Sequence, residues 1–262
     1  MKFKTRRIIL LVSLILLIII LGFLIVFLIN RKTNNKFKAE PVTLNFESRV
    51  DKLETFDTGN FYKFGWLQIQ GTHIDLPILH SQSADYIDDI DYSYGWLSSF
   101  YSDGENRLVM VGHNILNVST EPMLPNENLT NFEELMAFTY YGFAKDNLYI
   151  QYTENGKDEL YKIYAIGFFD YFYDRGESMS DKKEIGEYIK KVKKNSLYDY
   201  DIDVNSNDEI ITVKTCTRMF GSDSNQQFQI DARKVRDGEK IETYQVKTTK
   251  MFEKLNLSKE KM

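Results

Sequence analysis

One segment of this 262-residue chain constrains its folding more than any other, because it is too apolar to lie in water. Residues 8–29 read IILLVSLILLIIILGFLIVFLI, which is 22 residues without a charge, interrupted only by Ser13 and Gly22. A helix of that length crosses the roughly 30 Å hydrocarbon core of a membrane. A cleaved secretory signal has a shorter apolar region and a small-residue cleavage site, whereas the basic Arg31-Lys32 follows here. A core helix would not be apolar on every side. We therefore expect an uncleaved transmembrane signal anchor.

The charges divide the chain at the same place. Residues 1–38 contain eight of the 33 basic residues and no acidic one, which leaves 25 basic against 38 acidic residues in the remainder. A body this acidic has no basic stripe for phosphates, which argues against a nucleic acid as its main ligand. Four basic side chains precede the apolar segment and four follow it, so only the free amino terminus favours a cytoplasmic N-terminus.

Four parts follow from this division. We expect a cytoplasmic N-terminus at 1–7, the anchor at 8–29, a polar linker at 30–45 and an extracytoplasmic domain at 46–262. This places the acidic body outside the cytoplasm, anchored to the cell membrane by a single pass.

Strand-like alternation dominates the body. The predicted strands are 66–70, 74–79, 108–111, 149–152, 160–169, 209–215 and 227–235. Helices are predicted near 131–138, where Thr130-x-x-Glu133 has the spacing of a capping box, and near 181–197, with a further short one around 47–56. We expect one mostly β domain with helices inserted in its connections.

The single cysteine, Cys216, is the most informative residue for chemistry. An unpaired thiol in an oxidising compartment is either buried and inert or kept for its reactivity. Polar neighbours surround it in the order Lys214-Thr215-Cys216-Thr217-Arg218, at the end of a predicted strand. A core strand seldom surrounds a cysteine in this way, and a nearby cation favours the reactive thiolate. These neighbours favour a nucleophile over a buried core residue.

A nucleophilic thiol requires a base, and three histidines are available. His73 and His80 occur in polar segments that we interpret as solvated loops. His113 closes an apolar strand as Val111-Gly112-His113-Asn114, which holds an imidazole at a fixed place on the rim of a fold. His113 and Cys216 therefore form a candidate Cys-His couple, with the structural role of a lone histidine as the alternative.

Motifs for other chemistries are absent from the sequence. It contains no Gly-rich phosphate loop, Gly-x-Ser-x-Gly elbow or His-Glu-x-x-His pair. The acidic cluster Asp85–Asp91 lacks the glycine and closing glutamate of an EF-hand loop, so we interpret it as a solvated loop. We expect no metal and no cofactor.

Several short motifs, in order along the body, resemble the sortases, the membrane-anchored cysteine transpeptidases of Gram-positive bacteria. Residues 64–78 (FGWLQIQGTHIDLPI) are similar to the opening hairpin of the family, and Val111-Gly-His-Asn114 to the segment that carries its histidine. Thr212-Val-Lys-Thr-Cys216 is similar to the Thr-Leu-x-Thr-Cys motif. A helix ending at Asn195–Asp199 before the cysteine strand, with no second apolar span, is typical of class B. The resemblance covers about Phe64 to Val235.

The resemblance implies an eight-stranded β-barrel and a two-step reaction. Cys216 would attack the carbonyl after the threonine of a sorting signal and form a thioacyl enzyme. An amine of a cell-wall precursor or a pilin lysine would then resolve it. The partners would be surface proteins or pilins with a sorting signal. His113 would act as general acid and then as general base, and Thr215 would help to bind the substrate or its oxyanion.

The chain departs from the family at the catalytic arginine. That position aligns with Gln227, which can donate a hydrogen bond but supplies no charge. Arg233 lies six residues further along the strand, about 20 Å at strand rise, too far to replace it. Arg218, two residues after the cysteine, is the better candidate. An incorrect register and an impaired or specialised enzyme are the alternatives.

Two other functions compete with a sortase-type enzyme. A membrane-tethered binding or scaffold protein could keep the fold without its turnover. A different Cys-His enzyme, such as an L,D-transpeptidase or a cell-wall peptidase, is disfavoured. The Ser-His-Gly-Cys arrangement of the former is absent, and His113 precedes Cys216 by 103 positions, whereas Cys-His peptidases of the cell wall usually have the cysteine first.

Overall fold

The structure, a computed structural model, describes most of the body of the chain. The described residues are 14, 16–22, 37–57, 62–80, 94–97, 106–129, 131–171, 179 and 181–257. Within these residues, no helix is both long and apolar enough to cross a membrane. Most of the predicted anchor at 8–29 and the whole acidic cluster Asp85–Asp91 lie outside the described residues.

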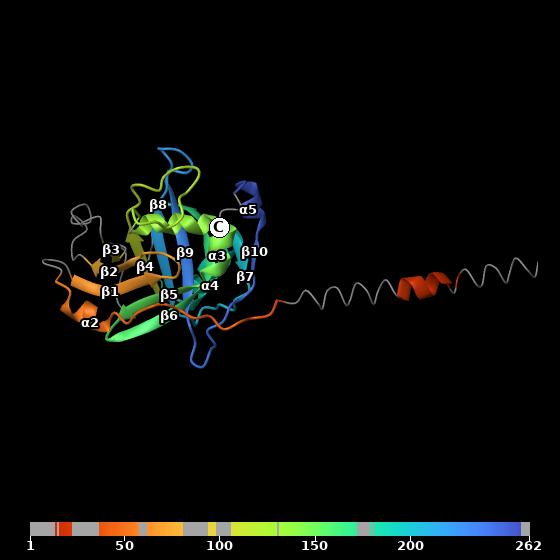
Figure 1. Cartoon of the computed structure of the whole chain (residues 1–262), viewed down its shortest axis with the longest axis horizontal. Helices are drawn as coiled ribbons and strands as arrows, with labels where there is room; N and C mark the ends of the chain where they lie inside the picture. The colour runs from red at the N-terminus through yellow and green to blue at the C-terminus, as the bar shows by residue number, and fades with distance from the viewer. Residues whose placement is uncertain are drawn as a thin grey trace, which may run out of the picture. The chain divides into compact units, whose positions relative to one another are not determined.

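Eight strands of the described region close into a barrel in the order β1-β2-β3-β4-β8-β9-β6-β5 (Figure 1). The barrel strands are β1 (Tyr62–Ile69), β2 (Asp75–His80), β3 (Gly95–Leu97), β4 (Arg107–Gly112), β5 (Tyr149–Glu154), β6 (Lys157–Asp170), β8 (Ile210–Cys216) and β9 (Gln226–Lys234). A second sheet pairs β7 (Tyr198–Tyr200) with β10 (Val246–Thr248). The expected eight-stranded, mostly β fold is thus confirmed.

Five helices accompany these strands in the described residues between 40 and 257. They are α2 (Val50–Thr55), η2 (Phe132–Thr139), α3 (Tyr141–Asp146), α4 (Lys182–Asn195) and α5 (Lys250–Lys254). All of these elements belong to one compact unit, Glu40–Met262, which begins six residues before the predicted boundary at 46. The unit begins before residue 46 because Pro41 forms a β-bridge with Glu242, and the Val42 N–H donates to the carbonyl of Ile241.

The helix predicted near 131–138 exists, but its type and environment differ from the prediction. Residues 132–139 form a 3₁₀ helix, η2, and all eight of them are buried. An amphipathic surface helix would leave Glu133 and Glu134 in water. Instead, Glu133 accepts from the backbone N–H groups of Ile115 and Leu116, and Glu134 accepts from that of His73. These carboxylates are buried because they complete the backbone hydrogen bonds of neighbouring loops.

Helix α4, Lys182–Asn195, lies within the range predicted for it, 181–197. The Asp181 side chain accepts from the backbone N–H groups of Lys183 and Glu184, which satisfies two of the free donors at the helix start. The buried residues of α4 are Ile185, Tyr188, Ile189 and Val192, which recur at helical spacing and so form one apolar stripe. They pack on the outside of the barrel with Tyr164, Ala165, Phe169 and Ile210. Helix α4 therefore covers the outer face of β6 and β8.

A buried polar cluster lies between α4 and this outer face. Asp231, which is fully buried, accepts from Tyr188 Oη at 2.5 Å and from Thr212 Oγ1 and Gln229 Nε2 at 2.7 Å each. Arg107 donates to Tyr188 Oη and lies 3.8 Å above that ring. Burial raises the pKa of Asp231, while the Arg107 charge and the three hydrogen bonds act in the opposite direction. Such a cluster is stable only when its members are paired.

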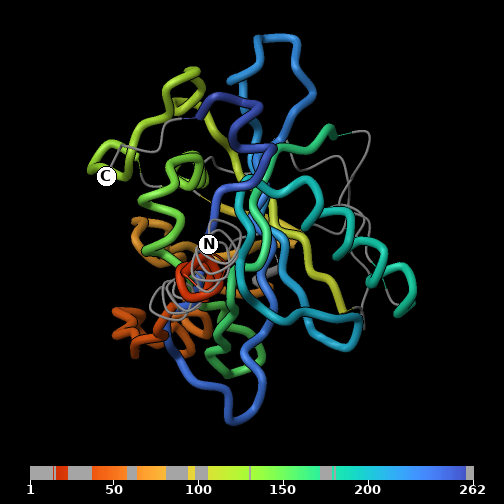
Figure 2. Tube along the Cα trace, turned by 90° about the vertical axis from the view of Figure 1, so that its right-hand side faces the viewer, coloured from red at the N-terminus to blue at the C-terminus, as the bar shows by residue number. Residues whose placement is uncertain are grey.

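The loops that follow β4 and β8 gather at one end of the barrel. Figure 1 and Figure 2 show the yellow-green segment after β4, the blue segment after β8 and the dark blue α5 at the same end. Helix α5 is fixed there by Thr249, whose hydroxyl donates to the carbonyl of Ser196, and by the buried ring of Phe252. This end of the barrel contains the carboxyl ends of the parallel strands β4 and β8.

The buried polar cluster around Asp231 should contribute to the stability of the fold. Replacing Tyr188 by Phe keeps the ring but removes the hydroxyl that serves Asp231, Gln229 and Arg107. We expect a loss of roughly 1–3 kcal/mol in the free energy of unfolding, the usual result of leaving a buried polar group without its partner. Urea unfolding would measure it.

Tyr200 supplies the matched control. Its hydroxyl is buried and has no hydrogen-bond partner among the described residues, so Tyr200→Phe should be neutral or slightly stabilising. Equal losses in the two variants would show that the hydrogen bonds of Tyr188 contribute nothing specific.

Candidate active site

The register of three neighbouring strands brings the segments of the predicted couple to the same edge of the barrel. Strands β4 and β8 are parallel, and each pair from Arg107↔Ile210 to Gly112↔Thr215 is separated by 103 positions. One residue further along are His113, which follows the end of β4, and Cys216, the last residue of β8, with the same separation. On the other side, β8 is antiparallel to β9, and Cys216 faces Gln227. Cys216 and Gln227 are therefore paired across β8 and β9, and His113 directly follows the β4 residue that pairs with Thr215.

Cys216 lies at the exposed end of a buried strand. The six residues of β8 before it are all buried, and Cys216 itself is exposed. Side chains alternate along a strand, so Cys216 shares the outer face with Thr212 and Lys214, while Ile211 and Val213 enter the barrel core. The buried strand therefore fixes the backbone of Cys216, while its exposed thiol is accessible to a substrate.

Competing influences set the pKa of this thiol. Partial burial raises the pKa of Cys216, because the thiolate loses hydration. The charge of Arg218 and a hydrogen bond from Gln227 lower it, but burial is the largest effect. The thiol form therefore predominates at neutral pH in the free protein. Both residues named as substitutes for the family arginine act on the sulfur.

The surroundings of Arg218 and Arg233 differ sharply. Arg218 is exposed and forms no ion pair with any carboxylate of the described residues. Arg233 is buried, and its guanidinium contacts both oxygens of Glu239, at 2.6 and 2.7 Å. The expectation that Arg233 cannot replace the family arginine beside Cys216 is confirmed. Its guanidinium is bound to Glu239, and it lies six residues after Gln227 along the strand. Arg218 is the guanidinium whose charge acts on the sulfur.

Thr215 joins the two strands directly before the candidate couple. Its side chain is fully buried, and Oγ1 donates to the carbonyl of Gly112 at 2.7 Å. The family resemblance implies that Thr215 helps to bind the substrate or its oxyanion. In the structure its hydroxyl binds the backbone of β4, so its visible role is to hold Gly112 and therefore the start of the His113 segment.

His113 is half-buried beside an aromatic ring that sequence analysis missed. The His113 and Trp96 rings lie 4.8 Å apart, tilted by 59°. The preceding Gly112 is required for close packing, because a Cβ there would lie 2.2 Å from Cγ of Phe132. Trp96 belongs to β3, which has only three residues and gave no alternation to detect.

Of the other two histidines, His73 is an exposed loop residue as predicted, whereas His80 lies in a strand. His73 Nδ1 lies 2.7 Å from Oε1 of the buried Glu134. His80 is the last residue of β2 and lies in a strand, with its ring 6.3 Å from that of Phe64. The prediction is wrong for His80, which ends a strand, and holds for His73, whose contact with the distant Glu134 was not visible in the local sequence. Neither contact involves Cys216.

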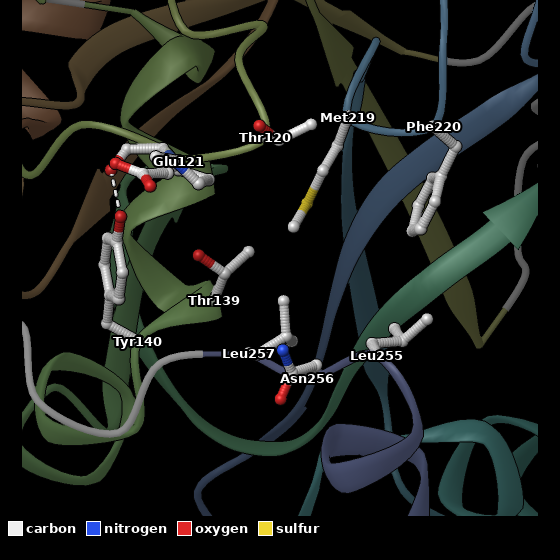
Figure 3. Close-up of a pocket in the computed structure, with 10 residues that line it drawn as sticks. Thr120, Glu121, Thr139, Tyr140, Met219, Phe220, Leu255, Asn256 and Leu257 are labelled. Atoms are coloured by element: carbon white, nitrogen blue, oxygen red, sulfur yellow. Dashed lines mark hydrogen bonds between the residues drawn. The ribbon is translucent and has the colours of Figure 1, made fainter.

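A pocket of about 500 Å³ opens at the same end of the barrel. Figure 3 shows its walls, which come from the segment after β4, from η2, from the loop after Cys216 and from the segment after α5. They include Pro122, Tyr140, Met219, Phe220 and Leu257. The Tyr140 hydroxyl donates to the carbonyl of Pro122 and fixes that wall. In the described part of the chain, no group of three or more His, Cys, Asp or Glu side chains could hold a metal ion.

Comparisons with known proteins agree with this geometry. No family model matches the chain. Sortase B of Listeria monocytogenes is 26% identical over 193 residues, which are 69% of this chain and 73% of the relative. Sortase B of Staphylococcus aureus is 22% identical over 233 residues, 82% and 91% of the two chains.

Solved structures show the same fold. The structure of Clostridium perfringens sortase B matches with a TM-score of 0.56 and 22% identity, covering 72% of this chain and 98% of the other. A Staphylococcus aureus sortase B–substrate complex matches with a TM-score of 0.56 and 14% identity, covering 72% and 86%. The sequence relatives and the shared fold together confirm that this chain resembles the sortase family and, within it, class B.

Proposed function

We propose that this chain is a membrane-anchored cysteine transpeptidase of the sortase type, with Cys216 as nucleophile and His113 as acid and base. The relatives support the general class, a sortase-type transpeptidase. The observation that carries the residue assignment is the register of the three strands, in which Cys216 pairs with Gln227 and His113 follows the β4 residue that pairs with Thr215. A nucleophile, a proton carrier and a hydrogen-bond donor on adjacent strands are the groups that acyl transfer requires.

In the first step the Cys216 thiolate attacks the backbone carbonyl carbon after the threonine of a sorting signal. The C–N bond of the peptide breaks, and the His113 imidazolium gives its proton to the departing amine. The threonine carbonyl remains on the sulfur as a thioester, and His113 is left neutral.

In the second step a neutral amine attacks the thioester carbon. His113 takes the proton that the amine loses, the C–S bond breaks, and the thiolate and imidazolium are restored. The product is a new amide between the surface protein or pilin and the acceptor, which is an amine of a cell-wall precursor or a pilin lysine.

Arg218 and Gln227 are the proposed donors to the oxyanion that forms in both steps. Gln227 faces Cys216 across the strand pair, and Arg218 is exposed with its charge acting on the sulfur. Gln227 offers a neutral N–H where the family has an arginine, and Arg218 supplies the positive charge. Thr215 contributes by holding β8 against β4.

The location of the enzyme rests on the sequence. The uncharged segment 8–29 supports a single-pass anchor, with residues 1–7 in the cytoplasm and the barrel outside it. A sorting signal and a cell-wall or pilin amine both occur at the outer surface, which is consistent with this orientation.

Gln227 also favours a second candidate function. A sortase-like scaffold protein would bind sorting signals without turning them over, because the arginine of the family is missing. Peptide binding that survives Cys216→Ala, together with no cleavage by the wild type, would favour the scaffold.

Formation of the thioacyl enzyme is the first test. Wild-type protein incubated with a threonine-containing sorting-signal peptide should gain the mass of the acyl fragment, and Cys216→Ala should not. His113→Ala should slow the adduct by about 10²–10⁴-fold, the usual contribution of a general acid or base. Intact-mass spectrometry follows both. A wild-type protein that forms no adduct with any such peptide, and whose thiol resists alkylating reagents, would refute the proposal.

Substitution at Arg218 tests the oxyanion donors. Arg218→Ala should reduce the transpeptidation rate by about 10²-fold, within the range for losing one such donor. Arg218→Lys should retain part of the activity, because lysine keeps the positive charge but lacks the planar guanidinium with its several N–H donors. Adding Gln227→Arg to Arg218→Ala should recover activity by restoring a cation opposite Cys216. Unchanged turnover in Arg218→Ala would eliminate Arg218 as the third catalytic group.

The pH dependence of alkylation tests the charge effect separately. Because burial raises the pKa of Cys216, the rate of alkylation by iodoacetamide should still be rising above the ordinary thiol pKa of about 8.5. Arg218→Ala removes a positive charge, moves the pKa further upward and should slow alkylation at neutral pH about two- to fivefold. Arg218→Lys is the matched control and should change little. A downward shift in Arg218→Ala would contradict the assigned sign.

A further inference from the structure

A side chain not assigned to the reaction connects the segment of His113 to the residue Cys216. The last ladder pair of β4 and β8 is Gly112↔Thr215, so backbone pairing ends one residue before the catalytic couple. Asn114, directly after His113, reaches across this gap. Its Nδ2 donates to the carbonyl of Cys216 at 3.0 Å.

The amide of Asn114 is engaged at both of its ends. Nδ2 also donates to the carbonyl of Asn117 at 2.8 Å, and Oδ1 accepts from the backbone N–H of Asn117 at 2.9 Å. The chemistry fixes this orientation, because the reversed amide would place Oδ1 against two carbonyl oxygens. Asn114 is 9% exposed, so water is a poor substitute for these partners.

The turn that carries Asn114 is held rigidly from beneath. Asn117, which is 1% exposed, donates through Nδ2 to the carbonyls of Met123 and Glu133, and its Oδ1 accepts from Met123 N. The Glu133 carboxylate accepts from Ile115 N at 2.9 Å and Leu116 N at 2.6 Å. The turn is therefore hydrogen-bonded to η2, and these bonds fix the position of Asn114.

His113 thus lies between two links from β4 to β8. Before it, Thr215 Oγ1 binds the carbonyl of Gly112, and after it, Asn114 Nδ2 binds the carbonyl of Cys216. The ladder alone would leave the backbone after Gly112 free to separate from β8. One hydrogen bond before His113 and one after it therefore fix the position of His113 relative to Cys216.

We propose that Asn114 is a positioning residue that fixes His113 relative to Cys216 through the Cys216 carbonyl. The proposal rests on the proposed function, since it uses the His113–Cys216 couple. Asn114 acts through its neighbours and touches no reacting atom. Its importance follows from the steep dependence of proton transfer on geometry, where a misplacement of about 1 Å can cost 10²-fold in rate.

A double-mutant cycle between Asn114 and His113 tests this role. Asn114→Asp keeps the shape of the side chain and the oxygen that accepts from the Asn117 N–H. It replaces the donating Nδ2 by a carboxylate oxygen, which would face the Cys216 carbonyl. We expect kcat to fall about 10- to 100-fold while the KM for the sorting peptide changes less than about twofold. In a His113→Ala background the same substitution should cause no further loss. Asn114→Ala, which introduces no charge, should give the same pattern and covers the case in which Asn114→Asp fails to fold.

Asn128→Asp is the matched control, because Asn128 is an exposed asparagine in the same connection between β4 and η2. It should leave kcat, KM and the melting temperature unchanged. Equal losses from Asn114→Asp in the His113 and His113→Ala backgrounds would overturn the proposal, as would full activity in Asn114→Asp and Asn114→Ala.

Alkylation of the thiol separates this inference from the proposed function, because it requires no peptide turnover. If His113→Ala changes neither adduct formation nor the alkylation profile of Cys216, the catalytic couple is wrong. If His113→Ala changes them and the Asn114 variants do not, only the positioning role is wrong. The expected result is a changed profile in the Asn114 variants that disappears when His113 is absent.

Discussion

The parallel pairing of β4 and β8 is the constraint on which the site depends. Both strands end at the same edge of the barrel, and their register keeps a separation of 103 positions up to Gly112↔Thr215. The segment of His113 and the end of the Cys216 strand, far apart in the chain, therefore meet at the same edge of the barrel. Parallel strands need a long crossover connection, and here the chain between them also contains β5, β6 and α4. The barrel core thus fixes the geometry of the couple.

The thiol sits where two requirements conflict. The barrel must bury most of β8 to fix Cys216, and that burial raises the thiol pKa away from neutrality. Arg218 and Gln227 act in the opposite direction without cancelling burial. In the proposed mechanism the same two groups receive the oxyanion, so one arrangement serves both the thiolate and the tetrahedral intermediate. A free protein with a mostly protonated thiol is compatible with this chemistry, because only a small thiolate fraction needs to react.

Local patterns in the sequence predicted what depends on local physics. Helix α4 and the two strands that flank the loop after Cys216 follow from periodicity, and the structure confirms them. Long-range contacts were not predictable in this way. The three-residue β3, the complete burial of η2 and the bond from Asn114 to Cys216 each depend on residues that meet only after folding. An asparagine directly after a strand-end histidine was the one visible sign of that bond.

The central claim is that His113, Cys216 and the donors Arg218 and Gln227 surround one reacting carbonyl. A crystal structure of the protein alkylated by a threonyl chloromethyl ketone that mimics the sorting signal measures this directly. The account predicts a bond from Cys216 Sγ to the ligand, with its oxygen about 2.7–3.1 Å from a nitrogen of Arg218 or Gln227 and the imidazole of His113 on the leaving-group side. A ligand oxygen that contacts neither donor, or a His113 ring directed away from the adduct, would contradict it.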